Sequence, residues 1–305
     1  VIATGILEFE EGVHLASGSS PTHVRGGVLR GHGTTETPLR LGRVAATGEG
    51  TVELTHVVFR GDSADSDYWA CFEASDAAAV VLRDAHFENC EVAFRAGGGP
   101  SLDLARLDTS DATTGYEIQA ELLGAITEPI LGVSRHLLLT GGTVPGGTVW
   151  RSLGVPWLVT CNGGCTTSGV VISGSVRIAA PIEILFDSTR PPERVGLVVV
   201  EGGSLRAEGS GRNIVFGSDR SDAPPGAWGF LNFERGSFGV LRDVLLRDGG
   251  GWVGSPIWLT PGATLSVTDT EFRNSLEHDI RVDCGATLTE SGNVYTTGIQ
   301  RTPCP

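Results

Sequence analysis

Two short acidic segments carry residues that could bind a metal ion. In the segment RGDSADSDYW, the carboxylates of Asp62, Asp65 and Asp67 lie two or three residues apart, and closely spaced oxygen ligands of this kind can hold Ca²⁺. Asp219 and Asp222 form a second, smaller group. The alternative is that both segments are ordinary surface loops, in which acidic and small residues are common. The sequence therefore offers Ca²⁺ at Asp62, Asp65 and Asp67 as its one candidate cofactor.

The six cysteines predict disulfide bonds. They form three pairs of near neighbours in the sequence: Cys71 with Cys90, Cys161 with Cys165, and Cys284 with Cys304. An even number of cysteines in a chain with extracellular features is typical of disulfide bonding, and closeness in sequence favours these three pairings among the several that six cysteines allow. A zinc site at Cys161 and Cys165 is the alternative, but no second pair of Cys or His residues has ligand spacing.

Composition argues against two classes of function. The net charge of −14 and the absence of lysine do not suit a nucleic-acid-binding protein, which needs a basic patch for the phosphates. No run of apolar residues is long enough to span a membrane. The chain starts at Val1 and contains no methionine, which predicts a mature secreted or cell-surface protein whose signal peptide has been removed.

One short phrase recurs four times and indicates the elements that must position these residues. Each copy has an apolar residue, a second apolar residue five positions later, and then a polar turn. The apolar pairs are Leu54 and Phe59, Leu82 and Phe87, Leu241 and Leu246, and Val267 and Phe272. Short apolar stretches separated by Gly, Asn and Asp are typical of strands and turns rather than helices.

The spacing of the copies predicts a solenoid. Leu82 follows Leu54 by 28 residues, and Val267 follows Leu241 by 26. Repeats of this length, with one strand-and-turn unit each, bury their apolar faces only by stacking on their neighbours. Stacked strands are about 4.8 Å apart, close to the Cα separation that a disulfide spans. Cysteines 19 or 20 residues apart can therefore join adjacent coils, although ordinary surface loops are the alternative.

A longer repeat divides the chain into two modules. The segment 26–42 (GGVLRGHGTTETPLRLG) matches the segment 202–218 (GGSLRAEGSGRNIVFGS), and copies of the phrase follow in the same order in each half. We therefore predict one continuous solenoid over 1–305, with a first module over about 1–120 and a second over about 157–305. The connecting residues, about 121–156, are the least regular.

A set of glycine, small and aromatic residues in the second module matches a known family. These residues are Gly203, Ser204, Leu205, Ala207, Gly209, Phe216, Ser218, Trp228 and Gly229. In this pattern the chain resembles the secreted right-handed parallel β-helix proteins of bacteria, well over 154–305 and more faintly over 1–115. The resemblance implies an all-β, right-handed parallel β-helix, for which we predict about 11–13 coils. It also implies an extracellular or surface location, and it says little about activity because the matching residues are structural.

The same fold serves enzymes that cleave polysaccharides, and the sequence lacks most of what they need. Polygalacturonase-like hydrolases carry a Gly-His-Gly motif, present here as Gly31-His32-Gly33, but their Asp-Asp pair and Arg-Ile-Lys segment are missing. Glycoside hydrolysis needs two carboxylates about 5–9.5 Å apart, so His32 alone is expected to be a surface turn residue. Arg60 would act as the base of a lyase only by analogy with the fold. We therefore predict no catalytic residues.

Two other sets of residues are expected to be structural. Arg83-Asp84 and Arg242-Asp243 occupy equivalent positions in the phrase, so stacked coils should form ladders of alternating charge that favour solubility more than a site. Four tryptophans near loop segments are expected to fill the interior of the coil rather than to stack on sugars. They are Trp69, Trp228, Trp252 and Trp258.

The function that these features favour is structural. We predict a non-catalytic secreted scaffold or adhesive element, which assembles head-to-tail into a fibre if the strand edges at the ends of the solenoid meet in another copy. The alternative is a carbohydrate-active β-helix, either a polysaccharide lyase or a polysaccharide-binding module. The expected partners are further copies of the chain or a polysaccharide, and neither nucleic acid nor a membrane.

Overall fold

The computed structural model shows an all-β chain wound into a parallel β-solenoid of about ten turns, which confirms the predicted fold class. It describes residues 2–3, 5–15, 21–61, 70–76, 78–126, 136–160, 169–190 and 195–305. The chain divides into two compact units, Val1–Leu138 with Leu153–Val155, and Leu139–Ser152 with Pro156–Pro305. In the described residues, no helix has the length and apolar character needed to cross a membrane.

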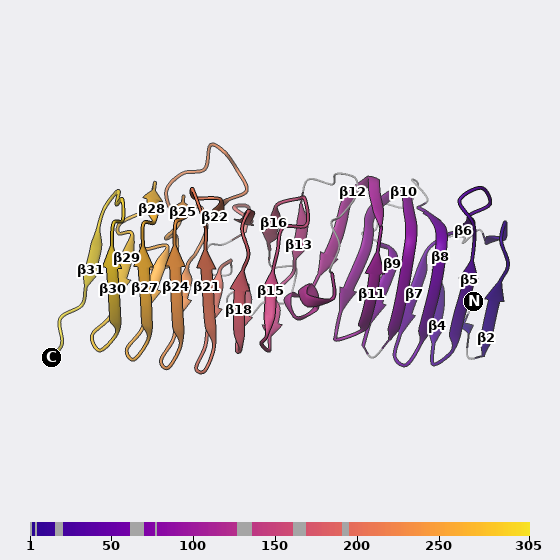
Figure 1. Ribbon diagram of the computed structural model, residues 1–305, viewed down its shortest axis with the longest axis horizontal. Helices are drawn as coiled ribbons and strands as arrows, with labels where there is room; N and C mark the ends of the chain where they lie inside the picture. The colour runs from indigo at the N-terminus through magenta and orange to yellow at the C-terminus, as the bar shows by residue number, and fades with distance from the viewer. Residues whose placement is uncertain are drawn as a thin grey trace. The chain divides into compact units, whose positions relative to one another are not determined.

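The first unit contains several long strands that bend from one face of the coil to the next (Figure 1). Its elements are β1 (Ile2–Ala3), β2 (Ile6–Phe9), β3 (His14–Leu15), β4 (Thr22–Arg25), β5 (Val28–His32), β6 (Leu39–Leu41), β7 (Val44–Thr47), β8 (Thr51–Arg60), β9 (Ala70–Ser75), β10 (Ala79–Gly97), β11 (Ser101–Ala105), β12 (Asp108–Ile118) and the 3-10 helix η1 (Ala120–Ala125). Strand β10 pairs in parallel with β8, β9, β11 and β12. One long strand therefore contributes to more than one face of its coil.

The second unit has three parallel sheets, and a complete coil adds one strand to each of them (Figure 1). The first sheet contains β14 (Gly142–Val144), β17 (Val170–Ile172), β20 (Leu197–Val199), β23 (Leu231–Phe233), β26 (Ile257–Leu259), β29 (Ile280–Val282) and β31 (Ile299–Arg301). The second contains β15 (Thr148–Trp150), β18 (Ser175–Ile178), β21 (Ser204–Glu208), β24 (Phe238–Arg242), β27 (Thr264–Thr268) and β30 (Thr287–Ser291). The third contains β16 (Trp157–Val159), β19 (Ile182–Phe186), β22 (Ile214–Ser218), β25 (Val244–Arg247) and β28 (Glu271–Arg273). Strand β13 (Leu137–Leu139) lies at the boundary of the two units.

The register of the strands explains the repeated phrase. Leu82 lies beside Leu54 and Phe87 beside Phe59 in the first unit, and the second unit aligns Leu241 with Val267 in the same way. Equivalent apolar residues of successive copies therefore pile up inside the coil. The solenoid has about ten turns rather than 11–13 because some coils are long, such as the one that holds the insertion 223–234 between β22 and β24.

The phrase also encodes a sharp corner two residues after its first apolar residue. The corner residues adopt positive φ angles: His56 (48°), Asp84 (52°), Arg106 (50°), Asp243 (54°) and Asp269 (51°). Left-handed backbone is uncommon outside glycine, and Asp and Asn tolerate it best. The recurrent Asp of the phrase thus turns the strand from one face of the coil to the next.

Gly33 and Gly209 occupy equivalent positions in the two segments that match, and both allow close contact between coils. A Cβ atom on Gly33 would lie 2.4 Å from the carbonyl oxygen of His56, and one on Gly209 would lie 2.5 Å from that of Asp243. His56 and Asp243 are the corner residues of the next coil. At both positions only glycine leaves enough space beside the neighbouring backbone. This requirement explains Gly33, the last residue of the Gly-His-Gly motif.

Buried aromatic rings fill the interior of both units. In the first unit the rings of Phe59 and Phe87 stack with centroids 5.1 Å apart, and those of Phe72 and Phe94 stack at 5.6 Å. In the second unit the buried rings include Trp150, Trp157, Trp228, Phe186, Phe216, Phe233 and Phe272. Burial of these large apolar side chains along the coil is the main contribution to the stability of such a fold.

Two disulfides join adjacent coils. Cys71 in β9 bonds to Cys90 in β10, with Cα atoms 5.8 Å apart, and Cys284 bonds to Cys304, with Cα atoms 5.0 Å apart. Strands β9 and β10 pair with each other. Cys284 follows β29 and Cys304 follows β31, and these two strands also pair with each other. Both separations fit the spacing of stacked strands. The third expected pair, Cys161 and Cys165, lies outside the described residues.

Candidate functional site

Charged side chains on the outer faces of the first unit pair between neighbouring coils. Arg30 lies between two glutamates, with its guanidinium 3.9 Å from Glu8 and 3.1 Å from Glu53. Arg83 contacts Asp103 at 2.5 Å. Charge thus alternates through Glu8, Arg30 and Glu53. At the position where the ladder was expected, Arg83 lies between the uncharged Thr55 and Ala105 instead. Exposed ion pairs of this kind add about 0–1 kcal/mol each to stability.

The corner residues of the first unit form a second charged row. Arg106 donates two hydrogen bonds to Asp84, at 2.6 and 2.8 Å, and His56 lies 3.9 Å from the same carboxylate. These hydrogen bonds from Arg106 lower the pKa of Asp84 and outweigh the opposing effect of burial. The carboxylate therefore stays ionised and serves to hold three successive corners together.

Asp84→Asn should make the stability of the first unit less sensitive to acid. Because the folded pKa of Asp84 is lowered, its ion pair stabilises the fold above the unfolded pKa, and this contribution is lost as the pH falls through the folded pKa. Asparagine also tolerates the positive φ of this corner. Near neutral pH we expect the variant to lose about 1 kcal/mol or less of unfolding free energy, because the pair is partly exposed. On acidification the variant should lose less additional stability than the wild type. Urea unfolding of both proteins at neutral and at acidic pH measures the difference.

Asp76→Asn is the matched control for this experiment. Asp76 also has a positive φ angle, of 57°. Its carboxylate accepts a weak hydrogen bond from the hydroxyl of Ser75 and has no ion-pair partner among the described residues. An equal change of acid sensitivity in the two variants would contradict the role assigned to the Asp84–Arg106 pair.

A histidine surrounded by carboxylates lies farther along the first unit. The ring of His86 is 3.1 Å from Asp108, 3.6 Å from Asp111 and 4.0 Å from Glu88. Burial alone would raise the pKa of Asp108, but hydrogen bonds from Ser110 and His86 lower it overall. The part of the chain that the structure describes contains no group of three or more His, Cys, Asp or Glu residues arranged to hold a metal ion. His86 and these carboxylates form a cluster of close polar contacts between neighbouring strands.

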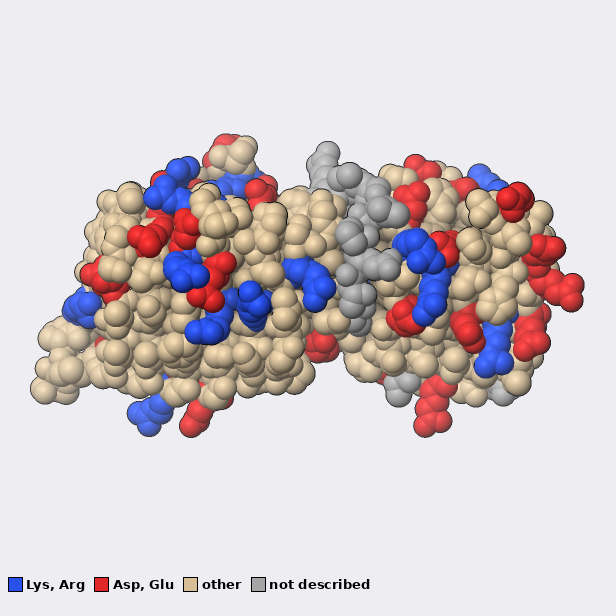
Figure 2. Space-filling model, in the orientation of Figure 1, with Lys and Arg blue, Asp and Glu red and all other residues tan. Residues whose placement is uncertain are grey.

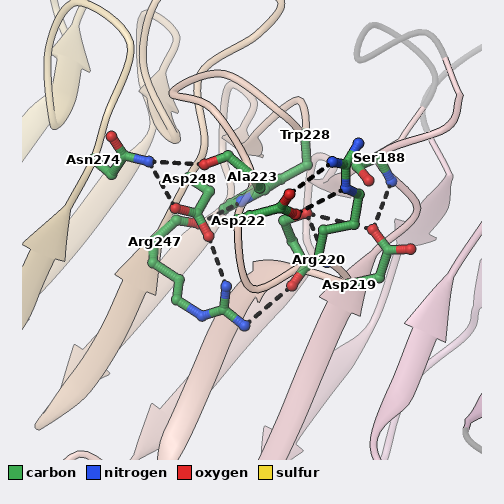
Figure 3. Close-up of polar contacts among 10 residues, drawn as sticks. Ser188, Asp219, Arg220, Asp222, Ala223, Trp228, Arg247, Asp248 and Asn274 are labelled. Carbon is green, nitrogen blue, oxygen red and sulfur yellow. Dashed lines mark hydrogen bonds and ion pairs between the residues drawn. The ribbon is translucent and has the colours of Figure 1, made fainter.

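The second unit has a denser polar junction where the turns after β22, β25 and β28 meet (Figure 3). Arg247 donates to the carboxylate of Asp248 at 2.7 Å and to the carbonyl oxygen of Ser218 at 3.1 Å. Asn274 donates to Asp248 at 2.9 Å and to the carbonyl oxygen of Ala223 at 3.2 Å. These contacts connect three successive coils to the inserted loop.

The other two carboxylates of this junction, Asp219 and Asp222, also accept hydrogen bonds. Arg220 donates two hydrogen bonds of 3.1 Å to Asp222 (Figure 3), which lower the pKa of that exposed carboxyl. Asp219 accepts a hydrogen bond of 3.0 Å from the backbone of Ser188. Asp219 and Asp222, the smaller acidic group in the sequence, are thus held by separate partners rather than directed together at one ion.

Trp228 anchors the inserted loop to the interior of the coil. Its ring is fully buried and stacks on Phe186 with centroids 4.2 Å apart, and its Nε1 donates to the carbonyl oxygen of Arg247 at 2.7 Å. The adjoining Gly217 leaves room for the guanidinium, because a Cβ atom there would lie 2.7 Å from Cγ of Arg247. The junction is therefore a packed, hydrogen-bonded structure.

Several carboxyl groups of the described residues have a lowered pKa and are held in the ionised form. They are Asp84, Asp108, Asp187, Asp222 and Glu271. Asp187 shows the cause: burial favours its neutral form, but hydrogen bonds from Thr160 and Thr189 and the charge of Arg190 lower its pKa overall. These carboxylates hold positive partners and backbone in place.

A different group of arginines lies on two neighbouring strands of the second sheet, β18 and β21, and directly after a third, β15. Arg151, Arg177 and Arg206 are exposed, and in the described part of the chain none of them has a hydrogen-bond or ion-pair partner. Arg177 and Arg206 lie directly side by side in the register of β18 and β21. Figure 2 shows basic side chains gathered on the face of the second unit that carries these strands. We call these three residues the arginine face.

The residues singled out in the sequence fall in several places. Asp62, Asp65, Asp67 and Trp69 lie outside the described residues. His32 is exposed at the end of β5, with Nδ1 2.9 Å from the hydroxyl of Thr55, and Arg60 is exposed at the end of β8. No protein-family model, curated protein or solved structure matches the chain.

The remaining tryptophans divide between interior and surface. Trp228 fills the coil as expected, but Trp252 is 54% exposed. Trp258 is partly buried, donates to Asp283 at 2.9 Å and lies under the guanidinium of Arg281. Sequence reasoning missed the two buried tryptophans Trp150 and Trp157. It also missed the arginine face, because no motif marks either feature.

Proposed function

We propose that the chain is a non-catalytic scaffold element of an extracellular or cell-surface structure. Two disulfides that join adjacent coils, Cys71–Cys90 and Cys284–Cys304, fit a protein of an oxidising, extracellular environment. A solenoid of stacked coils buries its core along one axis and leaves long, regular outer faces, which suits a protein that holds other molecules in place.

The observation that carries this proposal is the state of the clustered charges. Where acidic and basic groups meet at the corners and junctions of the coils, they are bonded to one another and to backbone across neighbouring coils, as in the contacts of Arg247, Asp248 and Asn274. A catalytic acid–base pair instead needs one protonated and one ionised group directed at a shared substrate. The clustered charges therefore serve to fix the coils.

An assay with polygalacturonate and alginate tests the proposal. The purified protein, with Ca²⁺ present, should produce neither the ultraviolet absorbance of an unsaturated product nor new reducing ends above the rate without protein. Cleavage that disappears in Arg247→Gln or Arg220→Gln would overturn the non-catalytic assignment, because these arginines lie at the densest carboxylate junction.

A polysaccharide-binding module is the second candidate, and one observation favours it. The arginine face leaves positive charge without a partner among the described residues, on an otherwise acidic chain with a net charge of −14. Binding at such a face requires no cleavage and is compatible with a scaffold. Head-to-tail assembly into a fibre stays a prediction; light scattering over a concentration series tests it, and monomer at every concentration would reject it.

A further inference from the structure

The arginine face differs from the matching face of the first unit in the residues that lie beside Arg206 on the neighbouring strands. Arg30 and Arg206 occupy equivalent positions in the segments 26–42 and 202–218. In the register of the strands, Arg30 lies between Glu8 and Glu53. Arg206 lies instead between Arg177 and Val240. The same position is therefore neutralised in one unit and left positive in the other.

Two arginines side by side cost stability unless something negative binds them. Neighbouring strands are about 4.8 Å apart, and like charges directly opposite each other on a sheet are destabilising. Nearby Arg242 is neutralised by Glu208 at 3.3 Å, but Arg177 and Arg206 have no such partner among the described residues. The unfavourable pair persists on a chain with an excess of carboxylates, which indicates an external anion as its partner.

Hydroxyl and aromatic groups flank the two arginines on the same face. Ser175 lies beside Ser204, and Ser204 lies beside Phe238, so these residues form a row two positions before the row of Arg177, Arg206 and Val240. Phe238 is 41% exposed. Exposed hydroxyls can hydrogen-bond to sugar hydroxyls, and an exposed aromatic ring offers an apolar surface to a pyranose ring.

We propose that the arginine face binds a linear anionic polysaccharide, with the guanidinium groups of Arg177 and Arg206 on the acidic groups of successive sugars. The planar fork of arginine pairs with carboxylate or sulfate through two parallel hydrogen bonds. The sheet repeats the same positions from strand to strand, so a ligand that repeats along its length suits it better than a compact one. This deepens the second candidate function and requires only that the chain does not cleave what it binds.

Binding of immobilised polygalacturonate by the full chain tests the proposal, with dextran sulfate and neutral dextran as further surfaces. The wild type should bind both anionic polymers and not the neutral one, and more weakly at high salt, which screens exposed charges. Arg177→Gln/Arg206→Gln should weaken binding at least about tenfold, since removal of even one charge-assisted hydrogen bond has an effect of that size. Its melting temperature should not fall, because the substitution removes a repulsion.

Arg235→Gln/Arg301→Gln is the matched control. Both residues are exposed in the second unit and have no ion-pair partner among the described residues, so the double variant removes the same total charge from other positions. Its affinity should stay within about twofold of the wild type, because binding that depends on a specific face is insensitive to distant charge.

Four results would overturn the proposal. These are no binding by the wild type, equal loss in the two double variants, binding only to anionic lipid vesicles, or self-association that Arg177→Gln/Arg206→Gln abolishes. None of them bears on the cleavage assay, so the binding site can fail while the non-catalytic assignment stands.

Discussion

Trp228→Ala should lower the free energy of unfolding of the second unit by about 3–5 kcal/mol, as expected for removal of a fully buried tryptophan. The ring is completely inaccessible to solvent and stacks on Phe186 at 4.2 Å. Its removal leaves a cavity, separates the inserted loop from the coil, and deprives the carbonyl oxygen of Arg247 of the hydrogen bond from Nε1. Urea unfolding followed by far-ultraviolet circular dichroism measures the loss.

Trp228→Phe separates the two contributions of this residue. The smaller ring keeps most of the contact with Phe186 but cannot donate to Arg247, so its cost should be about 1–3 kcal/mol, the range for a buried acceptor left without a partner plus some lost packing. A change of less than about 1 kcal/mol in Trp228→Ala would show that the loop is not anchored through this ring.

The strand register is the part of the fold that the sequence predicts best. Leu54 and Leu82, or Leu241 and Val267, carry the apolar periodicity that decides which side chains face the interior, and the structure places each pair side by side. In-register stacking buries like residues on like residues. A match between two short segments is therefore direct information about which side chains become neighbours along the coil.

The role of the phrase's aspartates was harder to predict. Asp84 and Asp243 are equivalent, as expected, but each turns the strand through a left-handed corner. Asp84 pairs with Arg106, while Asp243 accepts hydrogen bonds from the backbone of Gly211 and Arg212. Sequence spacing shows that two residues are equivalent, but the length of the neighbouring coil decides which partner each one meets.

The arginine face illustrates the same limit more strongly. Arg177 and Arg206 are neighbours only because Ser175 aligns with Ser204, and the intervening turns of variable length hide that alignment from any fixed period. Strands β14 and β15 and the buried Trp150 lie in the residues that showed the least regularity. Apolar runs of three residues are too short to indicate a strand without knowledge of the coil they join.

Phe59→Ala should lower the free energy of unfolding of the first unit by about 3–5 kcal/mol, the range for truncation of a buried phenylalanine. The ring is fully buried and contacts two other rings, stacked on Phe87 at 5.1 Å and edge-on to Phe72 at 5.5 Å. Its removal interrupts the aromatic packing between neighbouring coils. Thermal and urea unfolding monitored by circular dichroism give the change.

Two further variants, Phe59→Leu and Val81→Ala, test whether the loss of stability comes from the removal of a ring stacked inside the coil. Leucine keeps most of the apolar volume and loses only the preferred ring geometry, so it should cost less than alanine by the cavity contribution. Val81 points to the outer face of β10 and is only partly buried, so its truncation should cost about 1 kcal/mol or less. Equal losses in Phe59→Ala and Val81→Ala would mean that the first unit is not held by rings stacked inside the coil. The structure instead implies that removing one ring weakens the coils on both sides of it, because each coil buries its apolar face only against its neighbours.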